Sequence, residues 1–169
     1  MPDWPAIVTE YGPLAWRVAY RLVAHDADAA DCVQKAFAGA VALHAREGVR
    51  DWPAAITRLT TARALDCLRA RKRHAVPELV TEPPGRECDP LALAEASELA
   101  DALRHALAEI DPAQAEAFCL TAFDGFTNQQ AATALGRTAN HVGVLVYRTR
   151  AELRVKLRAF DPAQDAHHE

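Results

Sequence analysis

The chain has 169 residues, enough for one ordinary domain or two small ones, and half of them are hydrophobic, so it can bury a core. It has no apolar run as long as a membrane span and no signal-peptide pattern at its start, so we expect a cytoplasmic protein without membrane insertion. A net charge of −4 excludes tight DNA binding by non-specific phosphate attraction alone and favours a protein that reaches DNA with a partner.

Two helices are predicted in the first 48 residues. Apolar residues at spacings of three and four indicate a helix from about Ala6 to Ala24. Its apolar face comprises Ile7, Tyr11, Leu14, Val18 and Leu22. A second helix is expected to begin after the acidic caps Asp26 and Asp28 and to end near Gly48. Its apolar face comprises Val33, Phe37, Ala40 and Val41.

A third helix begins with Asp51 as its cap and Pro53 in its first turn. Its apolar face comprises Ile56, Leu59, Ala62, Leu65 and Leu68. Eight basic residues lie between Arg46 and Arg73, so this part of the chain is the basic part.

A linker is expected at 76–90, where four prolines and several acids make helix unfavourable. Residues 1–75 carry a formal charge of +3, residues 76–100 carry −5 and residues 101–169 carry −2. The chain therefore divides into a basic amino-terminal domain, 1–75, and a second domain, 91–160, followed by a polar tail, 161–169.

The second domain is also predicted to be helical. One helix covers about 91–109, and Asp111 starts another that stops at Gly125. Thr127 begins a short helix in a capping-box pattern that ends at Gly136, and Thr138 caps a last helix that runs to about Arg158. The expected fold class is all-α, with two small helical domains joined by the acidic, proline-rich linker.

The segment from Thr127 to about Arg150 has helix-turn-helix spacing, and a plain helical hairpin would give the same pattern. The last helix has a core face and an opposite polar face that could contact base edges. The core face comprises Val142, Val146, Leu153 and Leu157. The opposite face comprises Asn140, Val144, Tyr147 and Arg148.

The third helix carries a basic stripe. Arg58, Arg69 and Arg73 fall within roughly 60° of one another at 100° per residue, and Asp66 is placed to pair with neighbouring arginines. With Trp52 at the head of the helix, cations and an aromatic ring together suit single-stranded nucleic acid. A solvated helix end and a core tryptophan are the plainer interpretation.

Catalysis is not expected, because no nucleophile–base set, phosphate loop or metal constellation is present. The cysteines Cys32, Cys67, Cys88 and Cys119 lack the close spacing of a zinc site, so we expect reduced thiols, no metal and no cofactor.

Three segments resemble the sigma-70 family. The segment DADAADCVQKAF, Asp26 to Phe37, is similar to the region 2 signature DAEDLVQEVF, and the Trp52 to Arg73 helix is similar to the helix that follows in that region. The segment from Ala106 to Arg154 resembles region 4. A chain with regions 2 and 4 and a short linker has the plan of an extracytoplasmic-function (ECF) sigma factor.

The resemblance implies a transcription initiation factor that binds core RNA polymerase and directs it to promoter DNA. Region 2 would dock on the β′ clamp helices through Asp28, Asp31, Gln34, Lys35 and Phe37. The following loop and third helix would capture minus-10 bases through Trp52, Arg58, Arg63, Asp66, Arg69, Arg71, Lys72 and Arg73. Region 4 would contact the β flap and read the minus-35 duplex through Arg137, Thr138, Asn140, His141, Val144, Tyr147, Arg148 and Arg150. The linker would thread toward the RNA exit path, and an anti-sigma partner is common in the family.

Some positions depart from the family pattern. Residues 141–145 are His-Val-Gly-Val-Leu where Thr-Val-Lys-Ser-Arg is usual, so two cations and a hydroxyl are missing from the expected DNA face. Gly143 costs a helix interior about 1 kcal/mol relative to alanine. Lys35 stands where an acid is usual at the polymerase contact.

Two alternatives stay open. One is a stand-alone helix-turn-helix regulator with a helical interaction domain, which would bind duplex DNA alone. The other is a degenerate sigma relative that binds polymerase or another protein without starting transcription.

Overall fold

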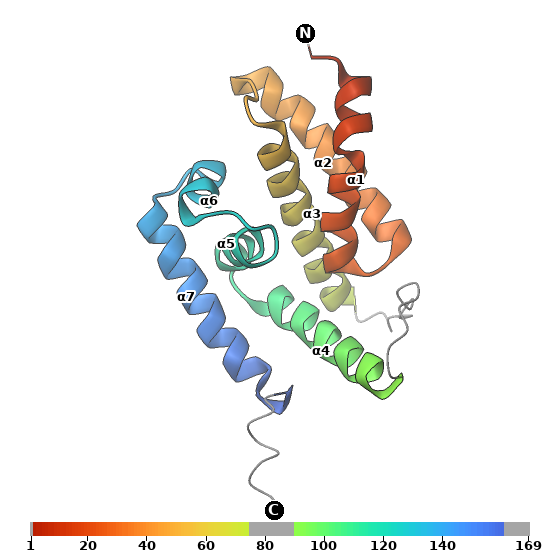
Figure 1. Cartoon of the computed structure of the whole chain (residues 1–169), viewed down its shortest axis with the longest axis vertical. Coiled ribbons are helices and arrows are strands. Elements are labelled where there is room, and N and C mark those ends of the chain that lie inside the picture. Colours follow the sequence, from red (N-terminus) through yellow and green to blue (C-terminus); the bar gives the residue numbers. More distant parts are fainter. Residues whose placement is uncertain (1, 75–89, 161–169) are drawn as a thin grey trace, which may run out of the picture.

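The computed structural model describes residues 2–74 and 90–160. The described elements are α1 (Trp4–Val23), α2 (Asp26–Glu47), α3 (Trp52–His74), α4 (Pro90–Glu109), α5 (Pro112–Ala122), α6 (Asn128–Leu135), α7 (Ala139–Lys156) and a final 3-10 turn, Arg158–Phe160. All are helical, so the predicted all-α fold class is confirmed (Figure 1). The predicted linker, except Pro90, and the predicted tail lie outside the described residues.

The amino-terminal three-helix unit, α1–α3, forms a bundle in which each helix contacts the other two. In α1 the Asp3 carboxylate caps the helix by accepting from the Ala6 backbone N–H at 3.1 Å, so the helix begins two residues before the predicted start. Of its predicted apolar face, Ile7, Val18 and Leu22 are buried.

The face of α2 that enters the core agrees only in part with the prediction: Ala40 is buried, and Val33 and Phe37 are partly buried against the core. Its buried residues are small and recur at helical spacing: Ala29, Cys32, Ala36 and Ala40. Predicted Val41 is instead 46 % exposed. Small side chains form the core face because they let α1 and α3 pack close to α2. The cap of α2 is His25, whose ring accepts from the Asp28 N–H, and the predicted caps Asp26 and Asp28 lie in the first turn.

The carboxy-terminal unit, α4–α7, has the predicted helix caps, although α5 ends at Ala122 and α7 at Lys156, slightly before the predicted ends at Gly125 and Arg158. Asp111 caps α5, accepting from the N–H groups of Ala113 and Gln114. Thr127 and Gln130 form the predicted capping box at α6, and Gly136 ends that helix in the left-handed conformation, at φ 62°. Thr138 then caps α7. The helix-turn-helix geometry of α6 and α7 therefore follows from local capping chemistry.

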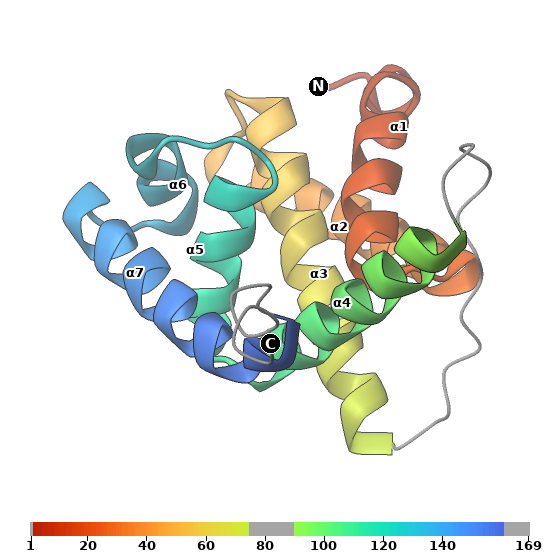
Figure 2. The same cartoon turned by 60° about the horizontal axis from the view of Figure 1, so that its bottom comes forward.

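The two units share one hydrophobic core. Leu65 and Leu68 of α3 belong to the same buried cluster as Leu107 of α4 and Leu120 of α5. Figure 2 shows α4 crossing α3 and α5 standing between α3 and α7. We call this arrangement, in which α4–α6 cover α3, the closed arrangement. No helix in the described part of the chain is long and apolar enough to cross a bilayer.

Candidate nucleic-acid and polymerase interface

A small charged surface lies on the exposed side of α2. Asp31, Gln34 and Lys35 lie at helical spacing on this side and all three are exposed. The Lys35 ammonium pairs with the Asp31 carboxylate at 2.7 Å, which raises the Lys35 pKa. Phe37 is half-buried and packs against the smaller core cluster at this end of the bundle. Three of the five predicted polymerase contacts are thus presented to solvent on one helix face.

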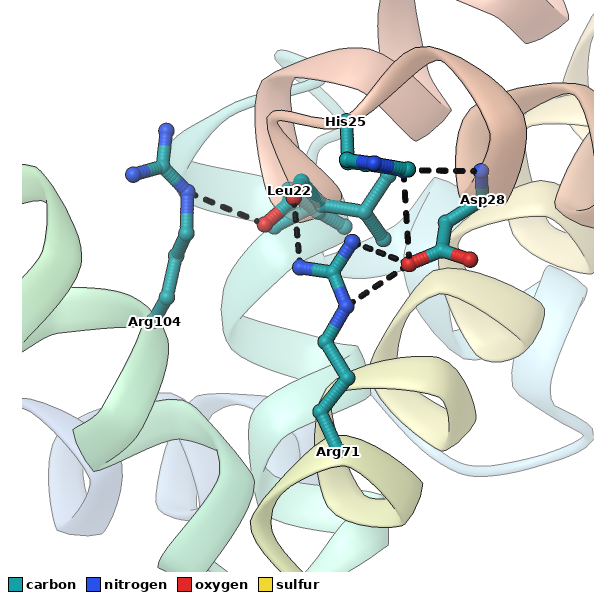
Figure 3. Close-up of polar contacts among 6 residues, drawn as sticks. Leu22, His25, Asp28, Arg71 and Arg104 are labelled. Carbon is teal, nitrogen blue, oxygen red and sulfur yellow. Dashed lines mark hydrogen bonds and ion pairs between the residues drawn. The ribbon is translucent and has the colours of Figure 1, made fainter. Parts of the chain in front are cut away.

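Asp28, also predicted at this surface, has an internal partner. Its carboxylate accepts hydrogen bonds from the guanidinium of Arg71, and another nitrogen of that guanidinium donates to the Val23 carbonyl at 2.7 Å (Figure 3). Arg71 therefore ties the end of α3 to the α1–α2 corner. Arg104 of α4 donates to the Leu22 carbonyl at the same corner, at 3.1 Å.

The head of α3 is aromatic. Trp52 stacks on His44 with ring centroids 5.6 Å apart and meets Trp4 edge-on at 5.4 Å. The indole is partly buried against the smaller core cluster. This position agrees with the plainer interpretation of Trp52 as a core residue, and part of its surface remains accessible.

The middle of α3 carries the predicted arginine–aspartate group. Asp66 lies 3.7 Å from an Arg63 guanidinium nitrogen and 3.4 Å from an Arg69 nitrogen, so the ion pairs expected from spacing are present. Arg63 and Asp66 are exposed. The Arg69 side chain is only 16 % exposed, because α5 covers this part of the helix.

A carboxylate of α5 faces the covered arginines. Glu116 lies in the field of Arg58 and Arg69, yet burial dominates and raises its pKa. One nitrogen of Arg69, Nη2, and one oxygen of Glu116, Oε1, are buried without a hydrogen-bond partner. Burying charged groups without hydrogen bonds costs free energy, so these two side chains destabilise the contact between α3 and α5. The contact is stabilised by the apolar core that the two units share.

Three further residues of the first unit, Arg21, Thr61 and Lys72, make polar contacts with the second. Arg21 of α1 pairs with Asp124 beyond α5 and donates to the Phe123 carbonyl, and Thr61 of α3 donates to Asp124 at 3.3 Å. Burial raises the Asp124 pKa despite the arginine. Lys72 pairs with Glu109 at 2.6 Å.

The exposed side of α7 has the composition that the sequence predicted. Its core residues Val142, Val146 and Leu153 are buried. Tyr147 is 75 % exposed and Val144 41 % exposed. The other predicted minus-35 residues are also exposed: Arg137, Thr138, Asn140, His141, Arg148 and Arg150. The Thr138 hydroxyl is used as the cap of α7, accepting from the His141 N–H at 3.2 Å.

The residues that sequence reasoning missed are the ones that join the two units: Arg21, Thr61, Glu109, Glu116 and Asp124. They lie far from their partners along the chain, and no local motif marks them. Among the described residues, no group of three or more His, Cys, Asp or Glu side chains is arranged to hold a metal ion.

Family comparison explains the two units. The family model described as Sigma-70 region 2 matches residues 7–74, and the model described as Sigma-70, region 4 matches residues 100–153. The chain belongs to the sigma-70 family. Region 2 therefore coincides with α1–α3, and the match to region 4 begins within α4 and ends within α7.

Relatives of this sigma-70 protein are of the ECF type. It is 27 % identical over 157 residues to the ECF RNA polymerase sigma factor SigE of Mycolicibacterium smegmatis, covering 91 % of this chain and 61 % of that one. The chain thus spans about three fifths of the length of this relative.

Two solved structures share the fold. The sigma factor RpoE of Bartonella quintana, solved in complex with the anti-sigma factor NepR, superposes with a TM-score of 0.58 at 22 % identity, covering 94 % of this chain and 98 % of that one. The extracytoplasmic function sigma factor SigJ of Mycobacterium tuberculosis has a TM-score of 0.52 at 28 % identity, covering 92 % of this chain and 54 % of that one. The predicted membership of the ECF group is confirmed.

Proposed function

We propose that this protein is a transcription initiation factor that binds core RNA polymerase and directs it to promoters. The observation that carries the proposal is the match of one chain to both sigma-70 regions, together with the solvent-facing sides of α2 and α7. A factor of this kind acts where the polymerase and the chromosome are, so we also propose that it works in the cytoplasm.

The side of α2 bearing Asp31, Gln34 and Lys35 is our proposed contact with the β′ clamp helices. Its charged and amide side chains are accessible without any change in the closed arrangement. In region 4, the groove between α5 and α7 has an apolar floor and an arginine rim, which suits a contact with the β flap. This groove, of about 580 Å³, is lined by Phe118, Ala122, Arg150, Leu153, Arg154 and Leu157.

The double substitution Asp31→Ala with Gln34→Ala is expected to weaken core binding by roughly tenfold or more, because it removes a charged partner and an amide, each worth about 0.5–1.5 kcal/mol or more. Sedimentation or anisotropy titration with core polymerase measures the change. Arg46→Ala with Glu47→Ala, at the exposed far end of the same helix, is the matched control. Normal core binding by the Asp31/Gln34 variant would show that the docking surface is elsewhere.

We propose that region 4 reads the minus-35 duplex from α7. Support comes from the exposed Asn140 and Arg148, whose amide and guanidinium can hydrogen-bond base edges, and from Val144, which can contact a thymine methyl. The face lacks the usual cations near Gly143, so phosphate attraction supplies less of the affinity here.

In the closed arrangement, part of the proposed minus-10 surface is accessible to solvent and part is covered by region 4. Arg63, Arg73 and the edge of Trp52 are accessible, whereas Arg69 lies under α5 and Lys72 is paired with region 4. Single-stranded bases cannot reach Arg69 while α5 covers it. We therefore propose that region 4 leaves α3 before minus-10 capture, and that the closed arrangement is the resting form.

Acid is expected to favour the closed arrangement. Burial in that arrangement raises the pKa of Glu116 and of Asp124 above 4.5 and 3.8, so the closed form binds more protons than an open form with solvated carboxylates. Closure therefore strengthens as the pH falls toward those values. Glu109 has the opposite effect on closure, because Lys156 and Lys72 lower its pKa to about 2 and acid would break these pairs. This loss begins only below pH 4.5, the ordinary pKa of the carboxyl.

Small-angle scattering tests this pH dependence. The radius of gyration should be smaller at about pH 5.5 than at about pH 8, and Glu116→Gln combined with Asp124→Asn should abolish the difference. Expansion of the wild-type protein on acidification, with circular dichroism unchanged, would refute it.

The second candidate is a degenerate relative that binds protein without starting transcription, favoured by the depleted face of α7. Because the RpoE neighbour was solved with an anti-sigma factor, we also include an anti-sigma protein among the proposed partners.

Pull-down with purified core polymerase, followed by run-off transcription on fragments of the source genome, tests the proposal. Binding with discrete transcripts supports it, and the transcript starts define both promoter elements. Binding without transcripts favours the degenerate relative. DNA retention by the protein alone, without core binding, favours the stand-alone regulator.

A further inference from the structure

The turn between α2 and α3, residues 48–51, is held by a residue of α2, and we call it the α2–α3 turn. The Gly48 N–H donates to the backbone carbonyl of His44 at 3.0 Å, and the Val49 N–H donates to the imidazole Nδ1 of the same residue at 3.2 Å. Gly48 has φ 73°, in the left-handed region that glycine adopts without strain. At the other end of the turn, the Asp51 carboxylate caps α3 by accepting from a backbone N–H at 3.0 Å. The turn is therefore fixed at both ends.

The hydrogen bond from Val49 identifies the tautomer of His44. A backbone N–H can only donate, so Nδ1 carries the lone pair and the proton of the neutral imidazole is on Nε2. The Val49 residue is half-buried, and its N–H needs a partner there. The imidazole of His44 thus supplies an acceptor to the second residue of the turn, as the backbone of α2 does to the first.

Two tryptophans fix the orientation of the imidazole. The ring of His44 stacks on Trp52 with centroids 5.6 Å apart and planes inclined by 29°, and it meets Trp4 edge-on at 6.1 Å. The two indoles also meet each other edge-on, 5.4 Å apart. The three rings come from three different helices, so turning the imidazole away from Val49 would break ring contacts with α1 and α3.

The α2–α3 turn presents a cation to solvent. Arg50 is exposed, and its guanidinium makes no ion pair or hydrogen bond with another residue in the described part of the chain. Arg46, near the end of α2, is instead paired with Glu47 at 2.9 Å. Figure 1 shows the turn at the end of α3 that lies away from α4. Arg50 is therefore accessible in the closed arrangement, two positions before the partly accessible Trp52.

We propose that His44 is a positioning residue for minus-10 capture, and that it positions Arg50 to contact a phosphate of the unpaired non-template strand. The proposal rests on the proposed function and adds two residues to the surface described there. A cation beside an aromatic ring suits single-stranded DNA, because the cation meets a phosphate while a base stacks on the ring.

The spacing between cation and ring must be fixed if one strand is to use both. The imidazole of His44 fixes it, because the same ring stacks on Trp52 and accepts from the turn that carries Arg50. A turn that is already ordered also loses less conformational entropy when DNA binds. Loss of the Nδ1 acceptor should therefore act on DNA binding through Arg50.

The test measures the affinity of the holoenzyme, at several salt concentrations, for a labelled non-template oligonucleotide from a promoter found by run-off transcription. Arg50→Ala is expected to weaken binding roughly fivefold to tenfold. It should also reduce the slope of log affinity against log salt by about 0.7, the contribution of one phosphate on a single strand. Arg46→Ala, at the same end of the bundle but outside the turn, is the matched control and should leave the slope unchanged.

Two substitutions of His44 separate its hydrogen bond from its packing. His44→Phe keeps a ring against the tryptophans and removes the acceptor, so it should weaken binding roughly threefold to tenfold and reduce the salt slope as Arg50→Ala does. His44→Asn loses the ring but keeps a carbonyl oxygen near the position of Nδ1, so it should retain most of the affinity. In the Arg50→Ala protein, His44→Phe should have no further effect, because both act through one contact. Circular dichroism and core binding check that each variant is folded.

Several results would overturn the proposal. A loss of affinity in His44→Phe with an unchanged salt slope, or a loss that adds to that of Arg50→Ala, would assign the imidazole only to the packing of the bundle. An equal reduction of the slope by Arg46→Ala would show a general charge effect. Run-off transcripts from the wild type, with variants that bind as it does, would overturn this proposal alone. Absence of transcripts from the wild-type holoenzyme would overturn the proposed function and this proposal with it.

Discussion

Arg21→Glu is expected to open the closed arrangement and to increase the affinity of the free protein for single-stranded minus-10 DNA by roughly tenfold to thirtyfold. The substitution removes the ion pair with Asp124 and the hydrogen bond to the Phe123 carbonyl, and it places a second carboxylate beside Asp124, whose side chain is only 5 % exposed. Breaking a buried pair typically costs 3–5 kcal/mol, and the 40 % exposure of Arg21 reduces this to about 2 kcal/mol.

The affinity should rise because only the open form can bind the DNA. When the open form is rarely populated, the apparent affinity is reduced in proportion to its population, so a larger open population means tighter apparent binding. The radius of gyration from scattering and the anisotropy of a labelled non-template oligonucleotide, taken from a promoter found by run-off transcription, measure the two changes together. Arg17→Glu, one turn earlier on the exposed side of α1, is the matched control. Adding Asp124→Asn should restore part of the closure. If the Arg21→Glu protein opens but does not bind DNA more tightly, then α5 does not inhibit minus-10 capture.

Arg69→Ala is expected to slow promoter melting by the assembled holoenzyme by roughly tenfold to a hundredfold while leaving core binding unchanged. A hydrogen bond to a charged group is worth about 1.5–3 kcal/mol, and Arg69 is the proposed minus-10 cation that the closed arrangement covers. Permanganate reactivity of unpaired thymines in the minus-10 element measures the rate. The holoenzyme is the correct sample, because in the free protein the same substitution would also change the surroundings of Glu116 under the closed arrangement.

Glu116→Gln separates these two effects. It should strengthen closure in the free protein, because it removes the buried charge as protonation would, and leave melting by the holoenzyme as in the wild type, since Glu116 belongs to region 4 and has no proposed role in base capture. Arg17→Ala controls for the loss of an arginine. Equal melting rates for Arg69→Ala and Arg17→Ala would mean that Arg69 serves only the closed arrangement.

Local chemistry made the helices predictable. Asp111, Thr127 and Thr138 cap helices with side chains that accept from backbone N–H groups within three residues, and such contacts follow from the sequence alone. The apolar face of α2 was misassigned at Val41 because its core positions are alanine and cysteine, which a search for large hydrophobic residues does not weigh.

Long-range contacts limited the prediction of the site. The basic stripe of α3 and the ion pairs around Asp66 could be expected from spacing on one helix. The cover over Arg69 could not, because Glu116 follows 47 positions later and its approach depends on how the two units dock.

In the closed arrangement, the two proposed DNA surfaces differ in their exposure to solvent. It covers Arg69 on α3 but leaves Asn140, Tyr147 and Arg148 of α7 facing solvent. If the closed arrangement is the resting form, as we propose, double-stranded DNA has access to one surface before unpaired bases have access to the other. This asymmetry implies a timing for promoter engagement: recognition of the upstream duplex can precede the separation of the two units, and strand capture must come after it.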